Sequence, residues 1–274
     1  MNFFVGFGKG FVSFFRAFKI IFGTKLWQYM FYSLLLWILM IVVTLYFVGE
    51  MAESIKAWIG EQMMLTSIPD EGHWLSWLKS FVNGYLGFLV SWVIKIAFWM
   101  ISGTLLKYVT LILISPIMSL LSESVEEHLT GKKYPFNFAQ LMKDVLRGVL
   151  INIRNMFIEY FFITVGFVLC IIFPPLSIIV TPVLLLFGWY FIGFSMMDYS
   201  CERNKMGVIQ SVRFVRKNKG VACGIGLCYA FFMALPFIIG DAIGMMIGPV
   251  MAVTGSTIAF IEIQKKEKDV PKTI

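Results

Sequence analysis

Long stretches without a charged residue are the feature that most constrains how this chain can fold. Residues 26–49 are 24 uncharged residues, and residues 160–197 are 38. At about 1.5 Å per residue, a helix of the shorter stretch can cross a hydrocarbon core of roughly 30 Å. Only 14% of the 274 residues are charged, whereas soluble domains carry about 25%. The sequence therefore predicts an all-α integral membrane protein and excludes a soluble enzyme.

Two of the uncharged blocks predict long transmembrane helices. The first span covers residues 24–49. The second covers residues 80–122 and is interrupted only by Lys95 and Lys107. As one helix, its 43 residues would reach about 65 Å, which exceeds the membrane thickness, so we expect a break at Pro116.

The two remaining blocks, residues 160–197 and 221–261, predict helical hairpins bent by proline. The arms before the bends have 14 and 15 residues, or about 21 to 22 Å, which is short for a complete crossing. Both hairpins are therefore expected to penetrate the membrane halfway and return. Four short complete crossings in a locally thin bilayer are the alternative. The expected hairpin tips are Pro174, Pro175, Thr181, Pro182, Pro236 and Pro249.

The returning arms of these hairpins are candidate anion sites. Thr181 with Pro182, and Gly248 with Pro249, are expected to begin the arms. The first turn of a helix carries partial positive charge, and broken transporter helices direct such ends at anionic substrates. The alternative is that the prolines only set the bend.

The distribution of basic residues predicts the orientation. Residues 1–25 hold four Lys or Arg and no acid, whereas residues 50–79 hold two against five acids. By the positive-inside rule, residues 50–79 form an external loop and both termini are cytoplasmic. The other expected segments are an interfacial helix over 1–23, a cytoplasmic helical region over 123–159, a basic cytoplasmic linker over 198–220 and a charged tail over 262–274.

The N-terminal segment has the pattern of an amphipathic helix. On a helical wheel Lys9, Ser13 and Arg16 share one face, and phenylalanines cover the other. Such a helix is typical of the membrane interface.

Three ionisable residues stand inside apolar blocks: Lys95, Lys107 and Asp241. A charge at the bilayer centre costs several kcal/mol unless it is paired or hydrated, so these residues are candidates for an ion path. Asp241 follows the expected bend of the second hairpin, where either lysine could pair with it. Alternatively, the lysines extend to the headgroups and Asp241 is solvated outside the membrane.

The start of the first span is a candidate anion-binding site, formed by Gly23, Thr24, Lys25 and Leu26. Thr24 is suited to cap a helix, Lys25 adds a cation, and the free amides of a first helical turn attract anions. The alternative is that Thr24 only caps the helix and Lys25 binds lipid phosphate.

A basic cluster lies between the hairpins, at Arg203, Lys205, Arg213, Arg216, Lys217 and Lys219. Such a cluster commonly anchors the cytoplasmic side of a membrane protein. It could also concentrate anions at a pore mouth.

The sequence lacks the residue sets that enzymes use. No Ser-His-Asp order, phosphate-binding loop or His-Glu-x-x-His motif occurs. The four cysteines form no Cys-x-x-Cys pair and only two histidines are present, so neither a metal nor another cofactor is expected. The net charge of +7 suits an anionic membrane leaflet, so no nucleic acid is expected as a partner. Permeation and membrane scaffolding are the function classes left.

Five stretches carry a family resemblance: residues 113–123, residues 197–199 with Arg203, residues 216–220, residues 224–226 and residues 235–257. In this order they resemble the CysZ sulfate permease family, which shares a domain with the eukaryotic etoposide-induced autophagy protein. The resemblance implies two long transmembrane helices, two half-penetrating hairpins, a homo-oligomer, and passage of sulfate across the bacterial inner membrane for cysteine synthesis.

Members of this family place a Gly-Leu-Arg type motif at the start of the first span, where sulfate is thought to bind. In this chain Leu26 matches the motif, whereas Trp27 and Gln28 stand at the arginine positions. The resemblance then leaves Lys25 to bind the anion, as a point charge rather than a two-pronged guanidinium.

The sequence thus predicts a permease or channel for sulfate or a related oxyanion that serves sulfur assimilation. The alternative is a non-transporting membrane scaffold that acts on lipids or as a subunit of an envelope complex. The expected partners are a small anion, membrane lipids and further copies of the chain, with an envelope protein in the alternative.

Overall fold

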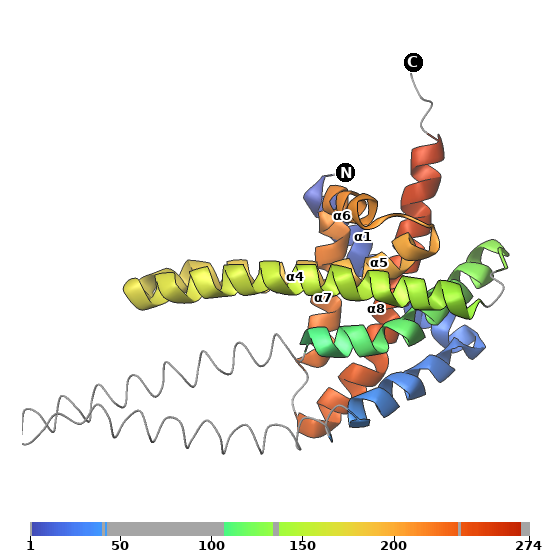
Figure 1. Cartoon of the computed structure of the whole chain (residues 1–274), viewed down its shortest axis with the longest axis horizontal. Helices are drawn as coiled ribbons and strands as arrows, with labels where there is room; N and C mark the ends of the chain where they lie inside the picture. The colour runs from blue at the N-terminus through green and yellow to red at the C-terminus, as the bar shows by residue number, and fades with distance from the viewer. Residues whose placement is uncertain (1, 40–41, 43–106, 134–136, 235–236, 270–274) are drawn as a thin grey trace, which may run out of the picture. The chain divides into compact units, whose positions relative to one another are not determined.

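The computed structural model describes residues 2–39, 42, 107–133, 137–234 and 237–269, and the regular elements in these ranges are all helical (Figure 1). The chain divides into two compact units, Met1–Trp37 with Tyr108–Ile274, and Ile38–Lys107. The first unit begins with α1 (Phe3–Gly23), the 3₁₀ turn η1 (Lys25–Trp27) and a helix from residue 28. They are followed by the helix Lys107–Thr130, α4 (Phe138–Ile172), the 3₁₀ turn η2 (Pro174–Leu176), α5 (Ser177–Arg203), α6 (Val208–Lys217), α7 (Lys219–Met233) and α8 (Phe237–Asp269).

Four of the described helices are long and apolar enough to cross a membrane. They are Lys107–Thr130, Phe138–Ile172, Pro174–Arg203 and Gly244–Glu267, while Lys219–Met233 is shorter. The prediction of an all-α membrane protein is confirmed. Several predictions fall outside the described residues. They concern Lys95, Pro236, the external loop over 50–79, the end of the first span at 40–41 and 43–49, and residues 80–106 of the second span.

Local signals explain several helix ends. Gly131 follows the helix Lys107–Thr130 with φ of 72°, a left-handed conformation that glycine adopts without strain. The Asn137 side chain accepts a hydrogen bond from the Gln140 amide at 3.1 Å and so caps α4. Pro174 and Pro175 form the turn between α4 and α5, where the missing proline N–H leaves no helical bond unmade.

The first hairpin differs from the sequence expectation in the length of its arms. α4 has 35 residues, or about 52 Å, because it begins at Phe138 rather than at residue 160. No proline separates its charged first half from its uncharged second half, so one helix runs through both. The prediction of a short first arm is therefore wrong for this hairpin. How deeply it enters a membrane stays a prediction.

Three prolines that were expected to break or begin helices lie inside helices instead. Pro116 is within Lys107–Thr130, Pro182 is within α5, and Pro249 is within α8. Thr181 and Gly248 therefore begin no arm. An internal proline costs about 3 kcal/mol. Burial of neighbouring side chains offsets this cost at two of them, since Met118 near Pro116 and Val250 after Pro249 are 0% exposed. Pro182 and both of its neighbours are exposed.

Close helix packing around α7 forms the centre of the unit. A Cβ atom added to Gly10 of α1 would overlap the Val221 carbonyl, and one added to Gly193 of α5 would overlap the Ala222 carbonyl. Residues without a side chain let helix backbones approach this closely. α7 is therefore held between α1 and α5, and α8 also packs against both α1 and α7.

The packing around α7 shows which face of α1 is buried, and this face differs from the one expected from the sequence. Gly6, Gly10, Ser13 and Ala17 are buried, so Ser13 does not share a water-facing side with Lys9 and Arg16. Phe4, Phe11, Phe15 and Phe22 are exposed, whereas Phe14 is 0% exposed and belongs to the core. A position of α1 in the membrane interface stays a prediction.

The far end of the first hairpin is apolar on its outer surface. Phe162 of α4 stacks on Phe187 of α5 with ring centroids 4.4 Å apart, which joins the two arms. Ile172 and Ile178, on either side of the turn, are 74% and 78% exposed. In Figure 1 the yellow end of α4 and the start of α5 extend together beyond α1, α7 and α8. Such a surface suits lipid or another apolar protein surface.

Gly10→Ala is expected to destabilise the protein by about 1 to 3 kcal/mol, because the added methyl group overlaps the α7 backbone. Thermal unfolding in detergent measures the effect. Gly8→Ala on the same helix is the control, since no atom lies within 4 Å of its Cβ position. Alanine there should favour the helix by up to about 1 kcal/mol. Equal melting temperatures of the two variants would contradict this packing.

Candidate functional site

A polar stripe runs along the otherwise apolar helix Lys107–Thr130. Ser115, Ser119, Ser122 and Glu126 follow one another at intervals of four, three and four residues, which places them on one helix face. All four are buried. This face therefore brings hydroxyl groups and a carboxylate into the protein interior.

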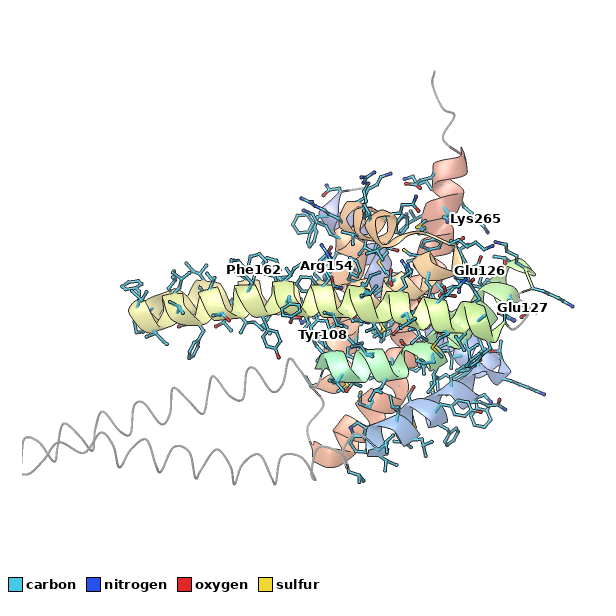
Figure 2. All side chains as sticks on the ribbon, in the orientation of Figure 1. Tyr108, Glu126, Glu127, Arg154, Phe162 and Lys265 are labelled. Atoms are coloured by element: carbon cyan, nitrogen blue, oxygen red, sulfur yellow. The ribbon has the colours of Figure 1, made fainter. Side chains whose placement is uncertain are left out.

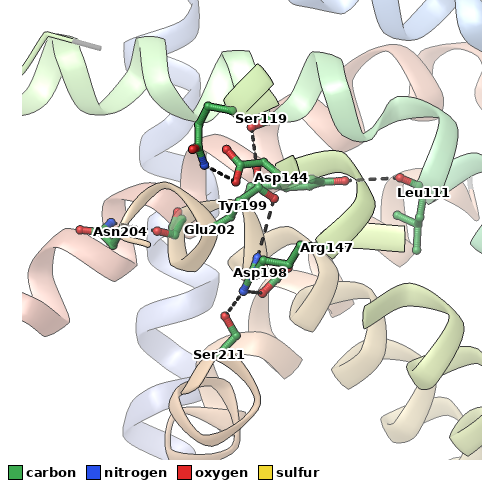
Figure 3. A network of polar contacts seen from close by, with 11 residues as sticks. Leu111, Ser119, Asp144, Arg147, Asp198, Tyr199, Glu202, Asn204 and Ser211 are labelled. Carbon is green, nitrogen blue, oxygen red and sulfur yellow. Dashed lines mark hydrogen bonds and ion pairs between the residues drawn. The ribbon is translucent and has the colours of Figure 1, made fainter. Parts of the chain in front are cut away.

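The C-terminal end of α5 brings charges to the same region, as Figure 3 shows. Arg147 of α4 donates from Nη1 to Asp198 Oδ2 at 3.1 Å and from Nη2 to Asp198 Oδ1 at 3.0 Å. It also donates to the Ser211 hydroxyl of α6. Glu202 lies 3.8 Å from Arg147 Nη1 and accepts a hydrogen bond from Ser119 at 2.8 Å. The Arg147 guanidinium thus links α4, α5 and α6, and Glu202 links it to the polar stripe.

A second arginine makes a neighbouring set of contacts. Arg203 forms an ion pair with Glu126, and its Nη1 donates to the Ser122 hydroxyl at 2.6 Å. Ser122 is 3.0 Å from the Thr257 hydroxyl of α8, which is 3.2 Å from the Ser200 hydroxyl of α5. α8 is therefore joined to the same polar region.

We call Arg147, Asp198, Glu202, Arg203 and Glu126 the buried charge cluster. The side chains of Arg203 and Glu126 are 2% and 7% exposed, and those of Arg147 and Asp198 are 14% and 5% exposed. Removing such charges from water costs several kcal/mol per ion, and only close pairing offsets it. With every group ionised, two arginines face three carboxylates, so the cluster has a formal charge of −1.

Several buried polar atoms on α4, α8 and the helix Lys107–Thr130 have no hydrogen-bond partner in the part of the chain that the structure describes. They are the Nε of Arg147 and the hydroxyls of Ser115, Thr254 and Ser256. Buried polar atoms are usually paired with protein or water. These atoms are therefore free to contact water or a small polar solute that enters the region.

The predicted anion site at the start of the first span lies on the protein surface, unlike the buried charge cluster. Thr24 caps η1, accepting from the Leu26 amide at 3.3 Å and donating to the Ile20 carbonyl at 2.7 Å. Lys25 and Gly23 are exposed, and Leu26 is half-buried. The structure thus has the cap that the sequence suggested, on the surface and separate from the buried charge cluster. Anion binding there stays a prediction.

The structure gives less information on the three ionisable residues that stand inside apolar blocks. Lys107 is the first residue of the helix Lys107–Thr130, and Asp241 lies in α8 with a side chain outside the described set. Pairing of Asp241 with a lysine, and a role for Lys95, stay predictions. Among the described residues, no group of three or more His, Cys, Asp or Glu side chains could hold a metal ion.

Sequence reasoning missed the buried charge cluster. Arg203 was assigned to the basic linker over 198–220, but residues 198–203 belong to α5 and Arg203 is buried against Glu126. Arg147 and Glu202 were not among the candidate residues. A detectable signal was the serine spacing before Glu126, together with the four-residue spacing of Asp198 and Glu202 on one helix face.

These features define the class of protein: an all-α membrane protein in which charges from several helices are buried together. A family model described as Sulfate transporter CysZ/Etoposide-induced protein 2.4 matches residues 13–239. The chain belongs to this family, which confirms the resemblance drawn from its sequence. Arg147, Asp198, Glu202, Arg203 and Glu126 all lie within the matched residues.

Individual relatives carry the same name. Sulfate transporter CysZ of Pseudomonas aeruginosa (strain LESB58) is 24% identical over 194 residues, which cover 70% of this chain and 73% of that protein. Sulfate transporter CysZ of Vibrio parahaemolyticus serotype O3:K6 is 26% identical over 216 residues, or 78% of each chain. That of Vibrio cholerae serotype O1 is 26% identical over 218 residues, covering 79% of this chain and 78% of that protein. The similarity therefore extends over most of each protein.

Arg203→Gln is expected to destabilise the protein by about 3 to 5 kcal/mol, because it leaves the Glu126 carboxylate buried without its cation. Chemical or thermal unfolding in detergent measures the loss. The double variant Arg203→Met with Glu126→Leu should recover most of it, since both charges are then absent.

Arg16→Gln is the matched control for this prediction. Arg16 pairs with Glu262 at 2.8 Å, but the two side chains are 60% and 39% exposed, so its loss should cost less than about 1 kcal/mol. Equal losses for Arg203→Gln and Arg16→Gln would contradict the buried pairing.

Proposed function

We propose that this chain is a permease that passes sulfate or a related oxyanion across the bacterial inner membrane. The observation that carries the proposal is the burial of two arginines, Arg147 and Arg203, between the helices of a membrane protein. Relatives named sulfate transporter support the choice of substrate. Supply of sulfate for sulfur assimilation is the corresponding cellular role.

Arginine has the chemistry that an oxyanion path needs. Its planar guanidinium offers five N–H donors and can grip two oxygens of one anion. Arg147 now uses Nη1 and Nη2 on Asp198 and Ser211, while Nε has no partner among the described residues. In the proposed mechanism an entering sulfate takes the place of a carboxylate as the partner of the guanidinium.

The paired carboxylates would allow the anion to leave again. Conduction requires binding strong enough for entry and weak enough for release. Asp198 and Glu126 compete with sulfate for the two arginines, so the anion is not held by an unopposed positive charge. The hydroxyls of Ser115, Thr254 and Ser256 would supply further hydrogen bonds along the way.

The proposal includes an arrangement in the membrane. Both termini face the cytoplasm, following the charge asymmetry of the sequence. The 15 residues of α7 reach about 22 Å, which supports partial penetration by the second hairpin. The exposed apolar surface of the α4–α5 hairpin supports assembly with further copies of the chain.

A non-transporting membrane scaffold is the second candidate function. Trp27 and Gln28 replace the arginines expected at the start of the first span, and the apolar end of the α4–α5 hairpin offers a surface for lipids or an envelope partner. On this proposal the buried charge cluster only holds the helices together.

Uptake of radiolabelled sulfate into proteoliposomes distinguishes the two functions. The wild-type chain is expected to raise uptake above that of protein-free vesicles. Arg147→Gln should lower uptake at least tenfold, and Arg147→Lys should retain part of it, because the cation remains without its two-pronged geometry.

Arg16→Gln is the control, since it removes an exposed arginine outside the cluster. Lys25→Gln tests the predicted site at the first span in the same assay. Wild-type vesicles that leak no faster than empty ones, with the protein folded, would favour the scaffold. Full uptake by a folded Arg147→Gln variant would show that the buried charge cluster takes no part in transport.

A further inference from the structure

An apolar groove with a cationic end lies away from the buried charge cluster. It has a volume of about 410 Å³ and is formed by the start of α1, the middle of α5 and the junction of α6 with α7. Its apolar wall includes Phe3, Val183, Leu186 and Phe187, and its lining also contains Arg216 and Lys219. This volume falls within the roughly 300 to 1,000 Å³ of ligand pockets.

The two cations of the groove are available to a ligand. Arg216 and Lys219 are exposed, and neither forms an ion pair among the described residues. Lys217, which lies between them in the sequence, instead pairs with Glu267 of α8 at 2.7 Å. No acidic residue lines the groove, so its positive charge is unopposed there.

The positive charge of the groove comes from Arg216 and Lys219. Arg154 of α4, labelled in Figure 2, is also an exposed cation but does not line the groove. Arg216 lies in the last turn of α6 and Lys219 is the first residue of α7, so the junction of these two helices contributes the positive charge. The groove is chemically divided into a cationic part and an apolar part.

We propose that this groove binds an anionic phospholipid. The phosphate contacts Arg216 and Lys219, and one acyl chain lies along Val183, Leu186 and Phe187. A free inorganic anion would leave the apolar wall uncovered. A zwitterionic lipid carries its own cation beside the phosphate, which weakens its attraction to Arg216 and Lys219. A lipid with net negative charge complements both parts, because each Lys or Arg near a phosphate adds about 1 kcal/mol of attraction.

Lipid retention measured on the whole protein tests this proposal. The protein is purified in detergent with an equimolar mixture of phosphatidylglycerol and phosphatidylcholine, and native mass spectrometry counts the lipids that stay bound. The wild type is expected to retain phosphatidylglycerol in preference. Arg216→Gln with Lys219→Gln should weaken this retention on the order of tenfold or more.

The control variant is Lys205→Gln with Arg213→Gln, which removes the same charge from exposed residues that do not line the groove.

A second test variant, Leu186→Trp, fills the apolar part of the groove without changing its charge. Leu186 is 42% exposed, so the larger ring can be accommodated without disturbing the core. It is expected to displace phosphatidylglycerol as well.

Three results would overturn the proposal. The first is an equal loss of phosphatidylglycerol from the groove variant and the control variant. The second is unchanged retention in Leu186→Trp. The third is displacement of phosphatidylglycerol by millimolar inorganic phosphate, which would assign the cations to a free anion. None of these results depends on sulfate uptake, so the lipid site and the transport function are tested separately.

Discussion

The structure depends on one constraint: charged side chains that are buried in the protein interior must pair with one another. The chain places Arg147, Arg203 and three carboxylates inside an apolar protein, where each ion alone would be strongly unfavourable. Their contacts fix how α4, α5 and the polar stripe on Lys107–Thr130 meet, and Thr257 extends the network to α8. An apolar set of side chains could hold these helices together equally well, so packing alone does not account for the charges.

Two kinds of packing surround this network and have different consequences. Around α7, glycines bring helix backbones into direct contact, which favours a rigid centre. At the far end of α4 and α5, apolar side chains contact mainly the other arm of the hairpin and remain exposed. The centre therefore fixes the positions of the buried charges, while the hairpin offers apolar surface to a membrane or another subunit.

Sequence reasoning predicted the features that depend on composition and run length. Uncharged runs predicted an all-α membrane protein because crossing lipid requires such runs, and short stretches around Asp198 and Arg203 indicated the family. It did not predict that Pro116, Pro182 and Pro249 lie inside helices. Burial of neighbouring side chains offsets the cost of Pro116 and Pro249, whereas Pro182 and the residues beside it are exposed. Nor did sequence reasoning predict the burial of Arg203, whose partner Ser122 lies 81 residues earlier in the chain. A count of charges by segment cannot detect pairing over that distance.

The most direct test of the account is whether water and sulfate reach the buried charge cluster. Ser119, which donates to Glu202, is replaced by cysteine after removal of Cys170, Cys201, Cys223 and Cys228. The rate of modification by a water-soluble, membrane-impermeant thiol reagent is then measured in native membranes, with sulfate or chloride present. The account predicts that the cysteine is modified and that sulfate slows the reaction more than chloride does. A cysteine that reacts only after denaturation, or at equal rates with the two anions, would contradict it.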